Sequence, residues 1–125
     1  TGLNLDDGGA LMAFRIRRPD GTALWAGGSL RRPDGTIQRF EPGDVRFETT
    51  GEWRSPRTDA LYPVRQTLHV RLPEGERVFP MVPLFEDQEL DGRNGGLPVY
   101  WEGAVTVPGG RGYLELTGYA DPLEL

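Results

Sequence analysis

The six-residue segment RRPDGT occurs twice in this chain, at residues 17–22 and again at 31–36. In each copy the proline presets the backbone angle φ for the first turn position, and the glycine accepts a positive φ. Only one short segment, residues 23–31, separates the two turns. The chain therefore has to reverse twice in quick succession, which predicts a three-stranded antiparallel meander.

Apolar residues elsewhere alternate with a period of two, and no helix-length window shows a 3.6-residue apolar period. The expected strands are 10–17, 23–31, 36–40, 45–49, 65–72, 77–84, 86–90, 98–107 and 111–119. We interpret them as an all-β, antiparallel barrel of about eight strands, because closure removes exposed strand edges. Such a barrel is just wide enough for one small ligand. A two-sheet sandwich is the alternative.

The composition excludes several classes of function. The chain has 125 residues, enough for a single domain, and it has no cysteine, which rules out disulfide frameworks, thiolate zinc sites and cysteine nucleophiles. Its net charge of −5 argues against nucleic acid as a partner. No apolar stretch approaches the ~20 residues of a membrane span. An arginine-rich group is able to bind anions, although we favour a solvated rim beside the turns: Arg15, Arg17, Arg18, Arg31 and Arg32.

Five short motifs, in order, resemble the C-terminal half of a lipocalin-like family that contains predicted secreted hydrolases and carotenoid 1,2-hydratases (hydroxyneurosporene synthases). They are Leu5-Asp6-Asp7-Gly8 with the first hairpin, Trp53-x-Ser55 with Tyr62-Pro63, Asp87-Gln88-Glu89, Tyr100-Trp101-Glu102-Gly103-Ala104 and Gly112-Tyr113-x-Glu115-x-Thr117-Gly118-Tyr119. One departure is Arg65-Gln66, where the family often has a tryptophan-containing strand.

The resemblance implies a lipocalin-like, calycin-type barrel over residues 1–125. It also implies that this domain is the C-terminal half of a two-domain bacterial protein whose N-terminal lipocalin-like domain is its partner. Because the chain begins at Thr1-Gly2 and runs directly into a patterned segment, we expect an upstream part. A secreted, periplasmic or cell-envelope location and a hydrophobic, isoprenoid-like small molecule are implied in the same way.

Two glutamates are the candidate catalytic residues. If the strands 98–107 and 111–119 pair, Glu102 and Glu115 fall near one another, and burial in an apolar cavity would raise the pKa of a carboxyl group there. A protonated carboxyl can protonate an alkene so that water adds, as a hydratase requires. A purely structural role at the barrel rim is the favoured alternative. His69, the only histidine, is expected on the surface, and no G-x-S-x-G elbow or three-histidine zinc set occurs.

Aromatic residues are the candidate ligand contacts, as a lid or wall of the barrel: Trp53, Tyr62, Tyr100, Trp101, Tyr113 and Tyr119. Trp53 is expected in a loop that covers the barrel mouth. Asp87 and Glu89 are expected to bridge to arginine or close the barrel, since their spacing supports a calcium site only weakly. No metal or cofactor is expected.

Three functions follow as alternatives. In the first, the full-length protein is an enzyme that hydrates, hydrolyses or cyclises a hydrophobic molecule, and this domain has little activity alone. In the second, the domain is a non-catalytic carrier of such a molecule. In the third, it is a structural or interface domain.

Overall fold

The computed structural model describes residues 1–121, which form antiparallel β-structure with two short 3₁₀-helices. The strands are β1 (Gly2–Leu5), β2 (Ala10–Arg17), β3 (Ala23–Arg31), β4 (Ile37–Phe40), β5 (Val45–Arg54), β6 (Leu61–Leu72), β7 (Gly75–Pro83), β8 (Glu89–Asp91), β9 (Val99–Val107) and β10 (Gly110–Leu116). The helices are η1 (Pro42–Asp44) and η2 (Arg93–Gly95). The predicted all-β, antiparallel class is confirmed.

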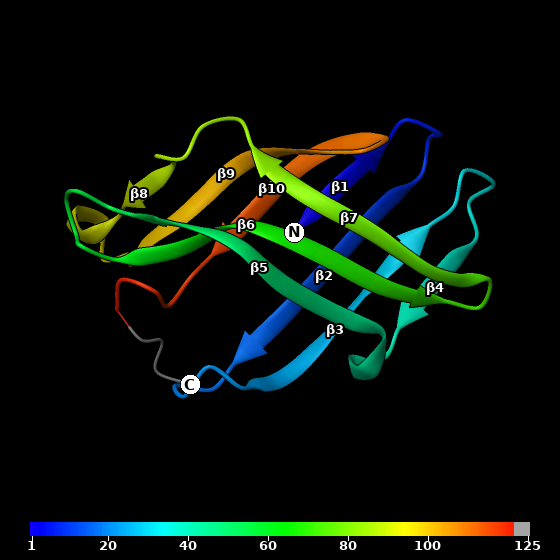
Figure 1. Ribbon diagram of the computed structural model, residues 1–125, viewed down its shortest axis with the longest axis horizontal. Coiled ribbons are helices and arrows are strands. Elements are labelled where there is room, and N and C mark those ends of the chain that lie inside the picture. Colours follow the sequence, from blue (N-terminus) through cyan, green and yellow to red (C-terminus); the bar gives the residue numbers. More distant parts are fainter. Residues whose placement is uncertain (122–125) are drawn as a thin grey trace.

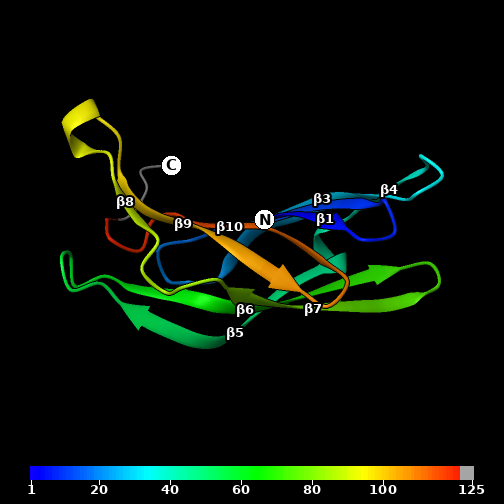
Figure 2. The same ribbon diagram turned by 90° about the horizontal axis from the view of Figure 1, so that it is seen from above.

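The strands belong to one sheet that folds over into two layers, as Figures 1 and 2 show together. The strand order is β4-β3-β2-β1-β10-β9-β7-β6-β5, and β8 pairs with β9 beside this path. Figure 2 shows β5, β6 and β7 as one layer and the remaining long strands as the other. The sheet crosses between the layers where β7 meets β9 through only two residue pairs, Val82 with Thr106 and Pro83 with Val105.

The sheet is not closed into the expected barrel. β4 and β5 stand at the two ends of the strand order and do not pair with each other. Helix η1, which includes Pro42, carries the chain from one layer to the other between them. Because β4 ends at Phe40, directly before this turn, it is too short to run alongside β5. The described residues therefore form ten strands around an open seam.

Both RRPDGT segments form the hairpin turns that their sequence predicts. Gly21 and Gly35 adopt φ angles of 87° and 88°, a region that favours glycine. In the first turn the Asp20 carboxylate accepts hydrogen bonds from the backbone N–H and the hydroxyl of Thr22, over 2.9 and 2.6 Å. The second turn repeats these contacts at Asp34. The two copies thus set the register of β2, β3 and β4.

The hydrophobic core lies between the two layers. Its largest fully buried side chains include Trp101, Tyr62 and Phe79. Trp101 is accommodated by Gly103, two residues along the same face, because a β-carbon there would collide with the indole ring. Gly28 lets β3 approach the Met12 carbonyl oxygen of β2 closely, because a β-carbon at this position would collide with that oxygen.

The strand boundaries differ from the prediction at several points, most clearly at β1 and around β5 and β6. β1 was not predicted, since four residues before an Asp-Asp-Gly-Gly turn give too short a pattern. β5 extends to Arg54 and β6 begins at Leu61, so Trp53 lies in a strand and not in a covering loop. Pro63 is tolerated in β6 because β7 pairs with β6 only from Gln66 onward, which leaves Pro63 at a sheet edge. Within residues 1–121, no helix is long and apolar enough to cross a membrane.

Candidate ligand-binding site

A cavity of about 620 Å³ opens between β2 and β10. Strand β1 separates these two strands and pairs with both of them only as far as Gly2, opposite Met12 and Tyr113. Beyond that point β2 continues to Arg17 and β10 to Leu116, with no strand between them among the described residues. The cavity therefore adjoins Thr1, the first residue of this chain, in line with β1.

The walls of the cavity are mainly apolar. Met12, Phe14 and Ile16 stand at its exposed mouth, while Leu114 and Leu116 are buried. Phe47 of β5 and Gln66 of β6 contribute from the opposite layer. The cavity therefore reaches from the outer surface of one layer into the space between the two.

Gln66 is a buried polar residue with an unsatisfied oxygen in the cavity wall. Its side-chain nitrogen donates to the Thr49 hydroxyl over 3.1 Å and to the Pro63 carbonyl oxygen over 2.9 Å. Its Oε1 atom accepts no hydrogen bond from the described residues. Gln66 was missed as a site residue, yet its position in phase with Leu68, Val70 and Leu72 was a readable signal of burial.

Arg15 and Arg17 extend from β2 into the space between the layers. The Arg15 guanidinium lies 5.8 Å from the centre of the Phe47 ring. The Arg17 guanidinium lies 3.8 Å from the centre of the Tyr119 ring and donates to the Thr117 carbonyl oxygen over 3.3 Å. Both arginines line the cavity and are half-buried.

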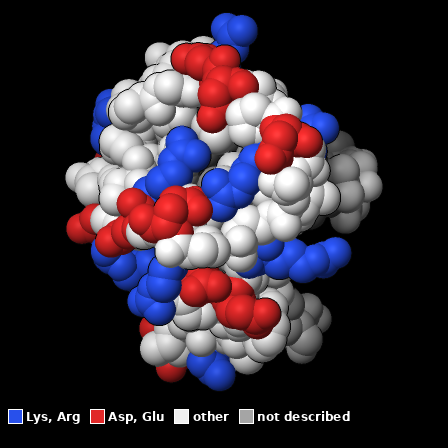
Figure 3. All heavy atoms as spheres, turned by 90° about the vertical axis from the view of Figure 1, so that its right-hand side faces the viewer, with Lys and Arg blue, Asp and Glu red and all other residues white. Residues whose placement is uncertain are grey.

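The expected solvated rim of arginines is therefore wrong for Arg15 and Arg17. They alternate with Met12, Phe14 and Ile16, and it is these apolar side chains that face outward. The expectation holds for the rest of the group, since Arg18 and Arg31 are exposed and Arg32 pairs with Glu74 over 2.8 Å. Figure 3 shows acidic and basic side chains interspersed in this way at the end of the molecule on the right of Figure 1.

The two candidate catalytic glutamates are brought together. Glu115 of β10 lies directly opposite Glu102 of β9. Both side chains are exposed on the outer face of the sheet, and Glu115 also lines the cavity mouth, where it accepts a hydrogen bond from the Thr117 hydroxyl over 3.1 Å. The burial on which the acid mechanism depends is not found around either carboxyl group.

The six candidate aromatic residues separate into three groups. Tyr113 and Tyr119 line the cavity. Tyr62 and Trp53 lie behind Tyr119, with ring centres 6.1 Å apart for Tyr62–Tyr119 and 6.2 Å apart for Tyr62–Trp53. Trp101 is fully buried and donates its indole N–H to the Glu86 carbonyl oxygen, while Tyr100 lies opposite Leu90 of β8, outside the cavity lining.

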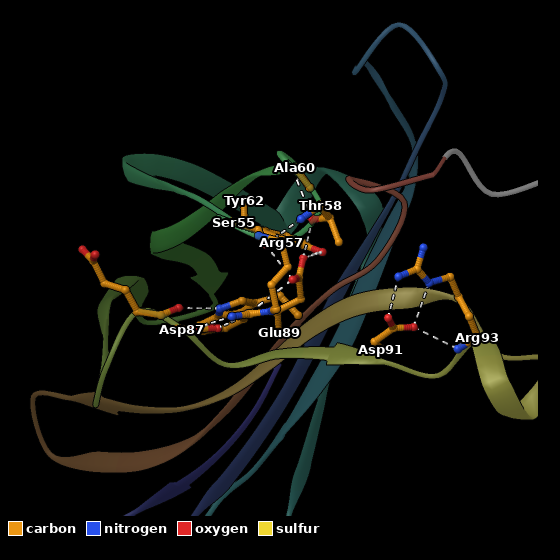
Figure 4. Close-up of polar contacts among 11 residues, drawn as sticks. Ser55, Arg57, Thr58, Ala60, Tyr62, Asp87, Glu89, Asp91 and Arg93 are labelled. Carbon is orange, nitrogen blue, oxygen red and sulfur yellow. Dashed lines mark hydrogen bonds and ion pairs between the residues drawn. The ribbon is translucent and has the colours of Figure 1, made fainter.

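Glu89 is the centre of a dense polar cluster, shown in Figure 4, next to the stacked aromatic rings. Its carboxylate accepts hydrogen bonds from the hydroxyls of Ser55, Thr58 and Tyr62 over 2.6, 2.7 and 2.7 Å. Arg57 lies 3.3 Å from the same carboxylate and also binds Asp87 through two hydrogen bonds. This confirms the expected bridge from Asp87 and Glu89 to arginine.

The surroundings of Glu89 keep its carboxylate ionised. Burial by itself would raise the pKa of this group, but the three hydroxyl donors, from Ser55, Thr58 and Tyr62, together with Arg57 lower it. In turn, burial and the hydrogen bond to Glu89 raise the pKa of the Tyr62 hydroxyl. Because every oxygen of Glu89 is already bound, this cluster ties the β5–β6 turn to β8 and leaves no free catalytic group.

His69 does not form part of a catalytic triad. Its ring nitrogens lie 2.9 Å from Glu76 and 3.0 Å from Glu48, so it connects β6 to the strands on both sides. No group of three or more His, Asp or Glu side chains within residues 1–121 is arranged to hold a metal ion.

The fold and the cavity together define a small antiparallel β-domain of two layers with a mainly apolar cavity in its wall. The chain belongs to the AttH-like family, whose model matches residues 1–119. A solved structure of a proposed AttH protein from Nitrosomonas europaea is 48% identical and superimposes with a TM-score of 0.86, covering 94% of this chain and 37% of that chain. The chain thus spans little more than a third of the length of this relative.

No curated protein matches the chain. The family model and the Nitrosomonas structure confirm the relationship that the motifs predict at the level of the AttH-like family. The narrower link to carotenoid 1,2-hydratases and secreted hydrolases stays a prediction, as does the two-domain organisation.

Proposed function

We propose that this domain binds an elongated, mainly apolar small molecule in the cavity between β2 and β10. A volume of about 620 Å³ lies within the range of roughly 300–1,000 Å³ that is typical of small-molecule sites. Apolar side chains from both layers form most of the lining, as is typical of such sites, and charged and polar side chains stand among them. An isoprenoid-like molecule, as the motif resemblance implies, suits this shape.

The observation that carries the proposal is the cavity itself, whose lining is mainly apolar and comes from both layers. Gln66 is the buried polar residue of this lining, and its side-chain nitrogen is held by Thr49 and Pro63. Its Oε1 atom has no donor among the described residues.

A catalytic form of this proposal would use Glu115 at the cavity mouth, with Glu102 beside it. In a longer protein a covering segment would supply the burial that acid-assisted hydration or cyclisation needs. Ligand binding is the function that the geometry of this chain supports best. Catalysis would require this binding together with the covering segment.

The test is calorimetric titration of the 125-residue chain with farnesol, an elongated isoprenoid alcohol, below the concentration at which farnesol aggregates. We expect saturable binding at one site. Ala13 is fully buried in the cavity lining, so Ala13→Leu should fill part of the cavity and weaken binding at least tenfold. Ala104→Leu makes the same change at an exposed position of β9, outside the lining, and should leave binding unchanged.

If Ala13→Leu fails to fold, Leu116→Trp tests the same cavity from β10. Equal affinities of the wild type, the cavity variant and the Ala104→Leu control would place the ligand elsewhere and refute the proposal. Absence of any binding to the wild type would refute it as well.

The outer face of the first layer supports a second candidate, the interface domain. Met12, Phe14, Ile16, Trp25 and Tyr113 are 45%, 36%, 40%, 55% and 44% exposed and lie on neighbouring strands. Clustered exposed apolar residues of this kind mark surfaces that contact other protein. We propose that a companion domain of the same protein covers this face, as the greater length of the Nitrosomonas relative allows.

A further inference from the structure

An aspartate or asparagine stands directly before a glycine at five places in this chain. They are Asp7-Gly8, Asp20-Gly21, Asp34-Gly35, Asp91-Gly92 and Asn94-Gly95. The order matters chemically, because a glycine has no β-carbon and its backbone nitrogen can therefore approach the side-chain carbonyl carbon of the residue before it. Attack by that nitrogen closes a five-membered succinimide ring. The structure separates one of the five places from the other four.

At the four aspartate sites the side chain is held in a way that opposes ring closure. Each carboxylate accepts a hydrogen bond from the backbone N–H two residues further along the chain, over 2.8 to 3.1 Å. Hydrogen bonds from these same neighbours also lower the pKa of Asp20, Asp34 and Asp91. An ionised carboxylate that is held by hydrogen bonds is a poor electrophile, so these sites resist attack.

Asn94 differs from the aspartates in both respects. Its side chain is a neutral amide, and the residue is exposed. The side-chain hydrogen bonds of this loop join Arg93 to Asp91, and within residues 1–121 the Asn94 amide takes part in none of them. The Asn94 side-chain carbon is therefore free to turn toward the nitrogen of Gly95.

The backbone around Asn94 can open locally. Helix η2 is a single turn of three residues, closed by hydrogen bonds from the Gly95 N–H to Gly92 and from the Gly96 N–H to Arg93, over 2.9 and 3.1 Å. Nothing lies within 4 Å of the place that a β-carbon would take at Gly95 or Gly96. Figure 2 shows η2, in yellow, standing away from both layers. A short exposed turn opens at little cost, and opening frees the Gly95 nitrogen.

We propose that Asn94 and Gly95 form a deamidation site, which is independent of the proposed ligand-binding function. The Gly95 nitrogen loses its proton to solvent base and bonds to Cγ of Asn94, while the side-chain amide nitrogen leaves as ammonia. Water then opens the succinimide ring. Opening at the backbone carbonyl gives isoaspartate, and opening at the side-chain carbonyl gives aspartate. No group is oxidised or reduced, and either product carries one negative charge more than Asn94.

Isoaspartate lengthens the backbone of η2 by one methylene group. The fold tolerates this change, because β8 pairs with β9 through its own residues and Glu89 holds β8 to the β5–β6 turn. The new carboxylate then lies on the surface of the loop. It suits an isoaspartyl methyltransferase, an enzyme class that transfers a methyl group from S-adenosylmethionine to such a carboxylate.

The experiment incubates the folded 125-residue chain in heavy-oxygen water at mildly alkaline pH and then maps its peptides by mass spectrometry. We expect isoaspartate and aspartate to accumulate in place of Asn94, each with one heavy oxygen atom. An isoaspartyl methyltransferase should methylate the incubated protein and leave the fresh protein unmodified. Asn4, the other asparagine, precedes Leu5 in the paired strand β1 and is the internal control, with conversion at least tenfold slower.

Two variants test the role of the structure. Gly95→Ala places a methyl group beside the attacking nitrogen, at a position with open space for it, and should slow conversion at least tenfold. Asp20→Asn creates a second asparagine–glycine pair in a turn where Thr22 holds the side chain. The asparagine introduced there should convert at least fivefold more slowly than Asn94.

Three results would overturn the inference. The first is conversion of Asn94 no faster than that of Asn4. The second is an Asn94 that stays intact in the folded protein and converts only in urea. The third is conversion in the Asp20→Asn turn as fast as at Asn94, since the hydrogen bonds of the turn would then give no protection.

Discussion

At the scale of single residues, Glu89 connects more of the molecule than any motif around it suggests. Its side chain is 2% exposed, and its partners come from the β5–β6 turn and from β6. Three neutral hydroxyls and one guanidinium compensate the burial of this charge. A buried carboxylate that is bound in this way resists truncation, because its removal leaves several donors without an acceptor.

We expect Glu89→Gln to lower the free energy of unfolding by about 3 kcal/mol at neutral pH. The amide keeps the shape of the side chain but has one acceptor oxygen in place of two and no charge for Arg57. Urea denaturation measures the change. Asp91→Asn breaks an exposed pair with Arg93 and serves as the matched control, with an expected loss below about 1 kcal/mol. Similar losses for both variants would show that the Glu89 cluster stabilises the fold no more than an exposed ion pair does.

The same residue predicts a pH dependence. The pKa of Glu89 is lowered from its ordinary value of 4.5, so its contribution to stability is complete above pH 4.5 and disappears as the pH falls through the lowered value. Other carboxylates also lose stability in acid, but Glu89→Gln removes only the share of Glu89. The difference in unfolding free energy between wild type and variant should therefore shrink between pH 7 and pH 3. A constant difference would contradict this assignment.

At the scale of elements, the hairpin turns were the most predictable part of the fold. Each RRPDGT copy determines its own turn, because proline, aspartate and glycine act on backbone angles within four residues. β1 and the full length of β5 were not predictable in this way. β1 is held by hydrogen bonds to β2 and β10, and β10 lies more than a hundred residues away in the chain.

Gly35→Ala should destabilise the domain by about 1 kcal/mol, because alanine is strained at a φ of 88°. Gly43→Ala is the matched control, since Gly43 has open space for a β-carbon and no left-handed φ. We expect the control to change stability by less than half as much, measured by thermal unfolding of both variants. Equal effects would show that the turn geometry does not limit stability.

The candidate site was less predictable than the turns, for a reason that Gln66 and Arg17 illustrate. Alternation shows which residues share a face, but it does not say which face is inside. Met12, Phe14 and Ile16 were the apolar set of β2, and the structure turns them outward. Which face of a strand is buried depends on how whole strands pair, and a local sequence pattern does not contain that information. Glu102 and Glu115 were correctly brought together because both lie on consecutive strands.

At the scale of the whole molecule, the exposed apolar face of β2 and β3 is the feature that one isolated domain does not explain. We expect Trp25→Ser to lower the melting temperature of a full-length protein by several degrees and to leave the 125-residue chain nearly unchanged. Val78→Ser, at an equally exposed position on β7 in the other layer, is the control and should affect neither. Thermal unfolding of both lengths would decide it, and equal responses to Trp25→Ser would refute a covering domain.

The open seam between β4 and β5 has a consequence for selectivity. A fully closed barrel has a fixed girth, and a ligand that is too thick is excluded by its walls. Here the ladder of hydrogen bonds joins the two layers at one narrow corner, where β7 meets β9, and β4 and β5 do not pair with each other. An open two-layered sheet of this kind accommodates ligand chains of different thickness.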